Sequence, residues 1–96
     1  MSSLDFLSAL EGVIDDRLES APPNSYTAKL AAGGPLKVAQ KFGEEAIELV
    51  VAASAENDAR LTSEGADLLY HLLVLLRLRG LTLDDIVAEL ESRHSA

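Results

Sequence analysis

Two acidic clusters are the residues of this sequence best suited to chemistry. Residues 41–48 have the form K-x-G-E-E-x-x-E, and Glu64 and Asp67 form an E-x-x-D further along the chain. Carboxylates three or four positions apart project from one face of a helix, and like charges at this spacing repel by about 0.2–0.5 kcal/mol per pair. Carboxylates gathered on two neighbouring helices therefore need a compensating cation. A hard divalent ion such as Mg²⁺, which takes oxygen ligands, is the natural candidate.

The surroundings of the second cluster favour a cleft. A polar stripe roughly 60° wide contains Arg60, Glu64, Asp67 and His71 when their positions are placed on an ideal helix. Leucine and valine occupy most other positions from 68 to 78, and a helix that is apolar nearly all round is normally buried. Buried carboxylates are costly unless they are paired or bound to a metal. The sequence therefore predicts a metal site beside this stripe.

Simpler interpretations were weighed for both clusters. The first also fits an ordinary amphipathic helix with a solvated charged face (Lys37, Lys41, Glu44, Glu45, Glu48) opposite an apolar one (Val38, Phe42, Ala46, Leu49, Val50, Ala53). His71 either bonds the site carboxylates or a substrate phosphate, or is a core histidine with satisfied hydrogen bonds; we favour the second. The single E-x-x-H at residues 91–94 does not make a di-iron bundle, which needs two such motifs.

Composition limits the classes of protein and partner. The 96 residues suggest a single domain over residues 1–96. A net charge of −8 argues against a nucleic-acid or anionic-membrane surface, although bound Mg²⁺ can invert the charge locally for a phosphate-bearing small molecule. The absence of cysteine excludes disulfides and thiolate metal sites. The N-terminus has no signal-peptide pattern, and the apolar stretch 66–78 is too short to span a membrane, so a cytoplasmic location is expected.

Helix signals recur along the whole chain, and strand alternation is absent. Capping residues, glycines and prolines predict long helices at about 4–19, 35–55, 59–79 and 83–93 and a short helical turn at 25–30, with Ser3 as an N-cap, Gly80 as a C-cap and a capping box formed by Thr82 and Asp85. The fold class is therefore all-α, a small domain of four to five helices. We expect several leucines between Leu68 and Leu78 to stay exposed in one chain, and hence a homodimer or larger homo-oligomer in which the long helices of two subunits form a bundle.

Four segments together resemble the phosphoribosyl-ATP pyrophosphohydrolase family of histidine biosynthesis. They are the S-Y-T at 25–27, the K-x-G-E-E-x-x-E at 41–48, the E-x-x-D-L-L-Y-H at 64–71 and the terminal R-H at 93–94. The two acidic motifs alone are similar to the wider superfamily of all-α nucleoside-triphosphate pyrophosphohydrolases. The other segments narrow the resemblance to the phosphoribosyl-ATP pyrophosphohydrolase family, and the resemblance extends over essentially the whole chain.

The resemblance implies an activity and a set of site residues. The activity is Mg²⁺-dependent hydrolysis of 1-(5-phosphoribosyl)-ATP to 1-(5-phosphoribosyl)-AMP and pyrophosphate. The metal-ligand positions match Glu45, Glu48, Glu64 and Asp67, while Glu44, or Glu45, would support catalysis or activate water. Lys29, Lys37 and Lys41 are candidate phosphate-binding residues, and each can equally be a surface charge. Because no cyclohydrolase domain of the next step is present, a stand-alone enzyme is expected.

Two other functions compete with this interpretation. A house-cleaning pyrophosphohydrolase acting on ordinary or damaged nucleoside triphosphates would use the same carboxylates, so the acidic clusters do not distinguish it from the biosynthetic enzyme. The S-Y-T and R-H segments favour the biosynthetic substrate. A non-catalytic helical assembly module would leave the acidic stripes merely solvated. The lack of heptad regularity and the predicted burial of the second stripe count against it.

Overall fold

The computed structural model describes residues 3–95, and all regular structure in that range is helical. A 3₁₀ turn, Ser3–Asp5, leads into five α-helices: α1 (Phe6–Ser20), α2 (Tyr26–Ala32), α3 (Pro35–Ala55), α4 (Asp58–Leu78) and α5 (Leu83–His94). The predicted all-α class is confirmed, and the boundaries differ from the predicted ones by a residue or two. The main difference is at the start of α1, where a 3₁₀ turn occupies the first positions of the predicted helix.

Local capping chemistry explains where the two later helices begin. The side chain of Asn57 accepts a hydrogen bond from the backbone N–H of Arg60 and so caps α4. Thr82 and Asp85 form a reciprocal capping box at the start of α5, as the sequence predicted. Gly80, between these helices, has φ of 74°, a left-handed conformation that favours glycine.

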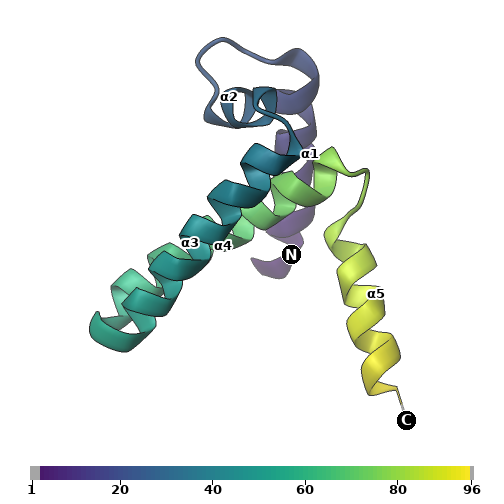
Figure 1. The fold of residues 1–96 in the computed structure, drawn as a ribbon. Helices are drawn as coiled ribbons and strands as arrows, with labels where there is room; N and C mark the ends of the chain where they lie inside the picture. Colours follow the sequence, from purple (N-terminus) through teal and green to yellow (C-terminus); the bar gives the residue numbers. More distant parts are fainter. Residues whose placement is uncertain (1–2, 96) are drawn as a thin grey trace.

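The core lies where α1 and α2 meet one end of a long helical hairpin. Figure 1 shows α3 and α4 side by side, with α1 and α2 gathered at one end and α5 diverging from the rest. Side chains from the four packed helices form the buried core: Ile14, Leu30, Val38, Leu73 and Val74. The opposite half of the α3–α4 hairpin projects from this core as an arm. The candidate ligands lie along the hairpin.

Burial on α4 differs from what the sequence suggested. None of the leucines from Leu68 to Leu78 is a large exposed side chain; Leu73 is fully buried and the others are half-buried. The expectation that several of them would stay exposed in one chain was therefore wrong. Packing of α1 and α3 against α4 covers them, so an argument for oligomerisation has to rest on other residues.

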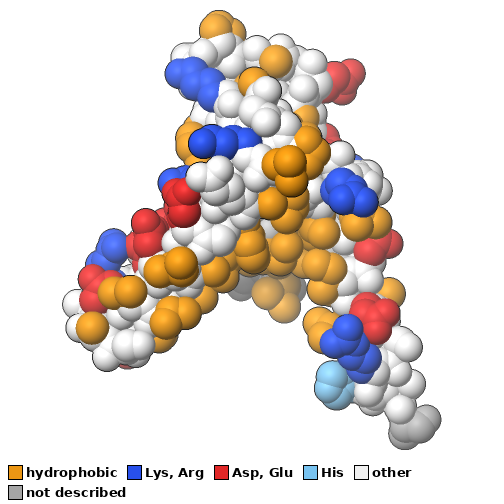
Figure 2. Space-filling model, in the orientation of Figure 1, with side chains coloured by type: hydrophobic (Ala, Val, Ile, Leu, Met, Phe, Trp, Pro, Cys, Tyr) orange, Lys and Arg blue, Asp and Glu red, His pale blue; other side chains and the backbone are white. Residues whose placement is uncertain are grey.

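The apolar surface lies instead on α3 and on the peripheral helices. On α3, Ile47 is 68% exposed, and Val50 and Val51 are also exposed. Figure 2 shows apolar side chains along the hairpin arm and across the middle of the same face toward α5. The simple amphipathic interpretation of α3 is thus wrong at both faces, since Val50 faces solvent while Glu45 is buried. No helix within residues 3–95 is long and apolar enough to cross a membrane.

Candidate metal centre

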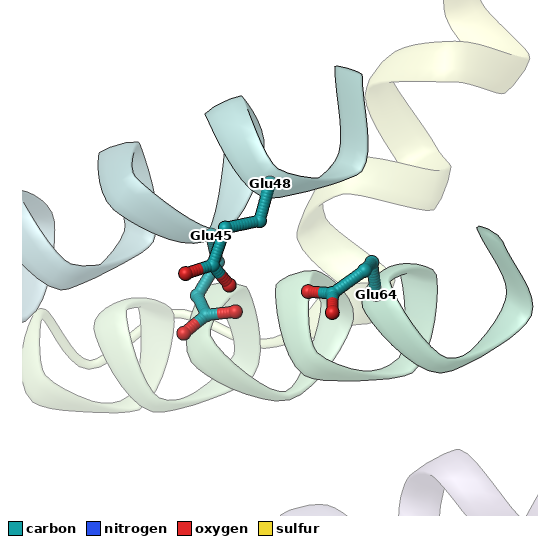
Figure 3. Close-up of side chains that lie close together, drawn as sticks. All are labelled: Glu45, Glu48 and Glu64. Atoms are coloured by element: carbon teal, nitrogen blue, oxygen red, sulfur yellow. The ribbon is translucent and has the colours of Figure 1, made fainter. Parts of the chain in front are cut away.

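Three of the four predicted metal ligands converge between α3 and α4. Glu45 and Glu48 come from α3 and Glu64 from α4, and one carboxylate oxygen of each lies within 4.8 Å of the others. Figure 3 shows the three side chains pointing toward one another from the two helices. Glu45 and Glu64 are only 6% and 5% exposed, whereas Glu48 is at the exposed edge. The arrangement offers several oxygen atoms to a single small cation.

Each of the two buried glutamates, Glu45 and Glu64, has a partner within the chain for only one of its two carboxylate oxygens. Glu45 Oε1 lies 3.4 Å from the ammonium of Lys41, and Glu64 Oε1 accepts a hydrogen bond of 2.5 Å from Arg60 Nη2. The second oxygen of each, Oε2, is buried and has no hydrogen-bond partner. Leaving a buried charged group unpaired costs more than about 1–3 kcal/mol. A divalent cation with oxygen ligands fits these unpartnered atoms.

The electrostatics of Glu45, Glu48 and Glu64 also favour a bound cation. Protonated Glu48 can donate a hydrogen bond to Glu45; this bond, followed by charge repulsion from Glu45, raises the pKa of Glu48, and Glu64 adds to the effect. Glu45 and Glu64 thus disfavour the ionised form of Glu48. A bound cation would reverse this by favouring the ionised forms.

A cavity opens beside the carboxylates on the hairpin arm. Its volume is about 320 Å³, and its lining combines charged and apolar side chains: Ile47, Glu48, Val51, Glu56, Arg60 and Glu64. Arg60, which lies within 4.0 Å of both Glu56 and Glu64, brings positive charge to this wall. The cavity therefore joins oxygen donors, a guanidinium and an apolar surface.

The remaining predicted carboxylates lie outside this group. Asp67, one turn after Glu64 on α4, is exposed and is not among the three side chains that converge. Glu44 is exposed as well; it accepts a hydrogen bond from Gln40 and lies 3.9 Å from Lys41. A ligand role for Asp67 and a catalytic role for Glu44 remain predictions.

The predicted phosphate-binding lysines differ in their surroundings. Lys41 forms ion pairs with Glu44 and Glu45, and its hydrogen bond with Glu45 raises the pKa of its ammonium group. Lys29 and Lys37 are exposed and form no ion pair within residues 3–95. Lys41 is therefore the lysine that the fold places at the carboxylate group. A phosphate role for all three stays a prediction.

His71 has the environment of a core histidine. It is 6% exposed; its Nε2 lies 2.6 Å from the Tyr26 hydroxyl and its Nδ1 lies 2.6 Å from the backbone oxygen of Asp67. Both ring nitrogens are thus occupied within the chain, as the favoured interpretation expected. Neither ring nitrogen bonds a carboxylate of the converging group.

Sequence reasoning assigned no role to several residues that line this region. Arg60 was placed on the polar stripe without a partner, and Tyr26 was noted only as part of a motif. The Glu56–Arg60–Glu64 series has i,i+4 spacing, which is the signal that could have identified the guanidinium as a partner of the buried Glu64. Nothing local indicated Ile47 and Val51 as cavity residues, because their role depends on how α3 packs.

These features define an all-helical protein with a candidate oxygen-donor cation site carried by a helical hairpin. Comparison with known proteins narrows this class. The family model for phosphoribosyl-ATP pyrophosphohydrolase matches residues 7–94. The chain is 54% identical to the phosphoribosyl-ATP pyrophosphatase of Pyrobaculum islandicum over 91 residues, which is 95% of this chain and 97% of that protein. It is 51% identical to the Rhizobium etli protein of the same name over 87 residues, covering 91% of this chain and 81% of that one.

Longer relatives contain a matching segment too. The chain is 53% identical over 89 residues to the histidine biosynthesis bifunctional protein HisIE of Xanthomonas campestris, covering 93% of this chain but 43% of that protein. It thus spans under half of the bifunctional relative and nearly all of the Pyrobaculum one. The chain belongs to the phosphoribosyl-ATP pyrophosphohydrolase family, a family of hydrolases.

Proposed function

We propose that this chain hydrolyses 1-(5-phosphoribosyl)-ATP to 1-(5-phosphoribosyl)-AMP and pyrophosphate, the second step of histidine biosynthesis. Family membership and the names of its relatives support the substrate. The structural observation that carries the proposal is the pair of buried, unpartnered oxygens on Glu45 and Glu64 beside Glu48. An enzyme of this biosynthetic pathway is expected in the cytoplasm.

We further propose that the activity depends on Mg²⁺. Glu45, Glu48 and Glu64 would hold the ion, and Asp67 is the candidate for a fourth ligand from the same face of α4. When bound, Mg²⁺ would neutralise charge on the triphosphate and on the departing pyrophosphate. The unpartnered carboxylate oxygens support a small, hard cation, which prefers oxygen ligands, over a softer metal, which would prefer nitrogen or sulfur ligands.

The chain's own residues supply the other parts of the reaction. Lys41, within 4.0 Å of both Glu44 and Glu45, can bind a phosphate oxygen, and the exposed Lys29 and Lys37 are the further candidates. A glutamate oxygen not engaged by the cation would accept a proton from the attacking water. Glu44 suits this role because it lies outside the converging group yet next to Glu45; Glu45 is the alternative.

We also propose that the working form is a homodimer or a larger homo-oligomer. The exposed Ile47 and Val51 of α3 line the carboxylate cavity, and Val50 of α3 and Leu61 of α4 are also exposed on the same arm. Burial of one such side chain is worth about 1.5–3 kcal/mol, so several together favour association. A second hairpin packed here would give a helical bundle and close the cavity.

A turnover assay tests the catalytic proposal. Pyrophosphate release is measured from phosphoribosyl-ATP and, in parallel, from canonical nucleoside triphosphates, with Mg²⁺ or with a chelator. We expect fastest release from phosphoribosyl-ATP and its loss in the chelator and in Glu48→Gln. Faster release from the canonical triphosphates would instead identify a house-cleaning enzyme. Absence of both release and Mg²⁺-dependent thermal stabilisation would support a non-catalytic assembly module.

A further inference from the structure

Two adjacent hydrogen bonds join the short helix α2 to the middle of α4. The Tyr26 hydroxyl bonds His71 Nε2 at 2.6 Å, and the neighbouring Thr27 hydroxyl forms a short hydrogen bond with the Tyr70 hydroxyl. The Tyr26 and His71 rings also meet edge to face, with centroids 5.7 Å apart. Thr27 and His71 are buried, whereas Tyr26 is 51% exposed. Both bonds tie the same helices together, and Tyr26 is the most exposed of the residues that form them.

The partners of His71 determine the direction of its bond with Tyr26. Its Nδ1 lies 2.6 Å from the backbone oxygen of Asp67, and a carbonyl oxygen can only accept a hydrogen bond. Nδ1 therefore carries a hydrogen. In the neutral ring Nε2 is then the acceptor, so the Tyr26 hydroxyl donates its proton to His71. The Tyr26 oxygen is left with lone pairs to offer to a further partner.

Two hydrogen bonds connect that oxygen to the proposed active site, because its partner His71 also bonds the backbone oxygen of Asp67, one turn after Glu64. Burial raises the pKa of the Tyr26 hydroxyl, which is also within electrostatic reach of Lys41, Glu45 and Asp67. The hydroxyl thus stays protonated at neutral pH and keeps its bond to His71. The ammonium of Lys41 lies 3.9 Å from Glu44 and 3.4 Å from Glu45, so these carboxylates engage this cationic donor.

The chemistry of the substrate selects what this oxygen can bind. Phosphate oxygens are acceptors and gain nothing from an oxygen that offers only lone pairs, whereas a ribose hydroxyl can donate to it. We propose that Tyr26 binds a ribose hydroxyl of the substrate, and that His71 is a positioning residue that makes the Tyr26 oxygen an acceptor. This inference rests on the proposed function, and it gives Tyr26 and His71 a role in substrate selection.

Four single variants separate this role from helix docking. Tyr26→Phe removes the acceptor and should raise the KM for phosphoribosyl-ATP by about tenfold, the worth of one hydrogen bond, with little change in kcat. Thr27→Val removes the neighbouring bond between the same helices and should leave KM unchanged. His71→Gln, whose amide oxygen can accept from Tyr26, should stay closer to wild type in KM than His71→Leu. Circular dichroism checks that each variant is folded.

Measuring KM for ATP with the same variants identifies which ribose hydroxyl of the substrate Tyr26 binds. A rise for both nucleotides in Tyr26→Phe that persists with ITP, which has no adenine amino group, assigns it to the ribose of ATP, and a rise for phosphoribosyl-ATP alone assigns it to the added ribose; either supports the inference. Unchanged KM values in Tyr26→Phe, or an equal rise in Thr27→Val, would overturn it while leaving the proposed function intact. Failure of the wild-type protein to hydrolyse phosphoribosyl-ATP would overturn the proposed function.

Nuclear magnetic resonance tests the positioning step without any turnover. The chain has 2 histidines, so ¹⁵N-histidine labelling with His94→Gln leaves His71 as the only signal source. We expect a protonated Nδ1 and an unprotonated Nε2 at mildly alkaline pH. The opposite tautomer would make Tyr26 an acceptor from His71, and would overturn the positioning role assigned to His71.

Discussion

At the scale of single residues, the site is a balance of formal charges. The three converging carboxylates, Glu45, Glu48 and Glu64, are accompanied by two basic side chains, Lys41 and Arg60. The carboxylates therefore keep at least one negative charge in excess when all are ionised, because Lys41 and Arg60 also pair with Glu44 and Glu56. Because two of them are buried with an oxygen unpartnered, this excess is felt at short range and attracts a cation. Predictions for individual carboxylates follow from this balance.

Substitution of Asp67 tests whether this residue is a metal ligand or a surface charge. If it completes the cation site, Asp67→Asn should fold and associate normally yet lose at least about a hundredfold in turnover, the scale of a lost electrostatic stabiliser. Its melting temperature without metal should rise or stay level, because repulsion with Glu64 is relieved, and the added stabilisation by Mg²⁺ should shrink. Near-normal turnover combined with a collapsed metal-free fold would show a structural role instead.

Glu48 should make the stability of the metal-free protein depend on pH. Its pKa is raised by Glu45 and Glu64 in the folded state above the ordinary value of 4.5, so the folded state binds the Glu48 proton more tightly than the unfolded state does. The contribution of this group to stability is present at lower pH and is lost as the pH rises through the raised pKa.

Thermal unfolding in a chelator, followed from acidic to neutral pH, measures this effect. The melting temperature of Glu48→Gln should fall less than that of the wild type as the pH increases, since glutamine does not ionise. Saturating Mg²⁺ should reverse the difference, because a cation favours the ionised glutamate. Identical pH profiles for the two proteins in chelator would contradict the assigned charge repulsion.

At the scale of elements, one basic side chain links α4 both to α1 and to the turn before α5. Arg77 Nε and Nη2 bond the two oxygens of Asp15 on α1 at 2.8 and 3.0 Å, and Nη1 bonds the backbone oxygen of Leu81 at 3.0 Å. A bidentate arginine–carboxylate pair fixes geometry as well as charge. This residue therefore sets how the carboxylate-bearing α4 lies on α1 and where the chain turns toward α5.

Asp15→Asn should weaken that link. Because the Asp15 side chain is 45% exposed, solvent screens the pair, and we expect a loss of about 1 kcal/mol in the free energy of unfolding. Asp16→Asn is the matched control: it removes a carboxylate whose partner is the adjacent, exposed Arg17, and should cost less than about 0.5 kcal/mol. Chemical denaturation of both variants provides the measurement, and equal costs would contradict the role given to Asp15.

At the scale of the whole molecule, the exposed apolar residues of α3 decide whether one chain is the working unit. Ile47→Glu places a charge in the surface proposed to meet a second hairpin, so it should shift the protein toward monomer in light scattering at micromolar concentration. Leu36→Glu, at the other end of α3 and 87% exposed, is the control and should leave the mass unchanged. A monomeric wild-type protein would refute the oligomer altogether.

The sequence by itself determined the helices and the residue types of the site. Caps such as Thr82 with Asp85, the left-handed Gly80 and Pro35 at the first turn of α3 act within a few residues of the chain, so their effects can be read locally. The spacing within each acidic motif likewise predicted which glutamates share a helical face. That Glu45, Glu48 and Glu64 converge agrees with the candidate metal site.

Only the tertiary structure decided which of these side chains are buried and what they meet. Burial depends on which face of one helix packs against another, and contacts between residues distant in the chain set that rotation. Glu45 became buried while Val50 became exposed, and the leucines of α4 were covered by α1 and α3. The bond from Tyr26 to His71 spans 45 positions, too far for any local pattern to predict. The unpartnered oxygens of Glu45 and Glu64 exist only because packing removed them from water without supplying a donor.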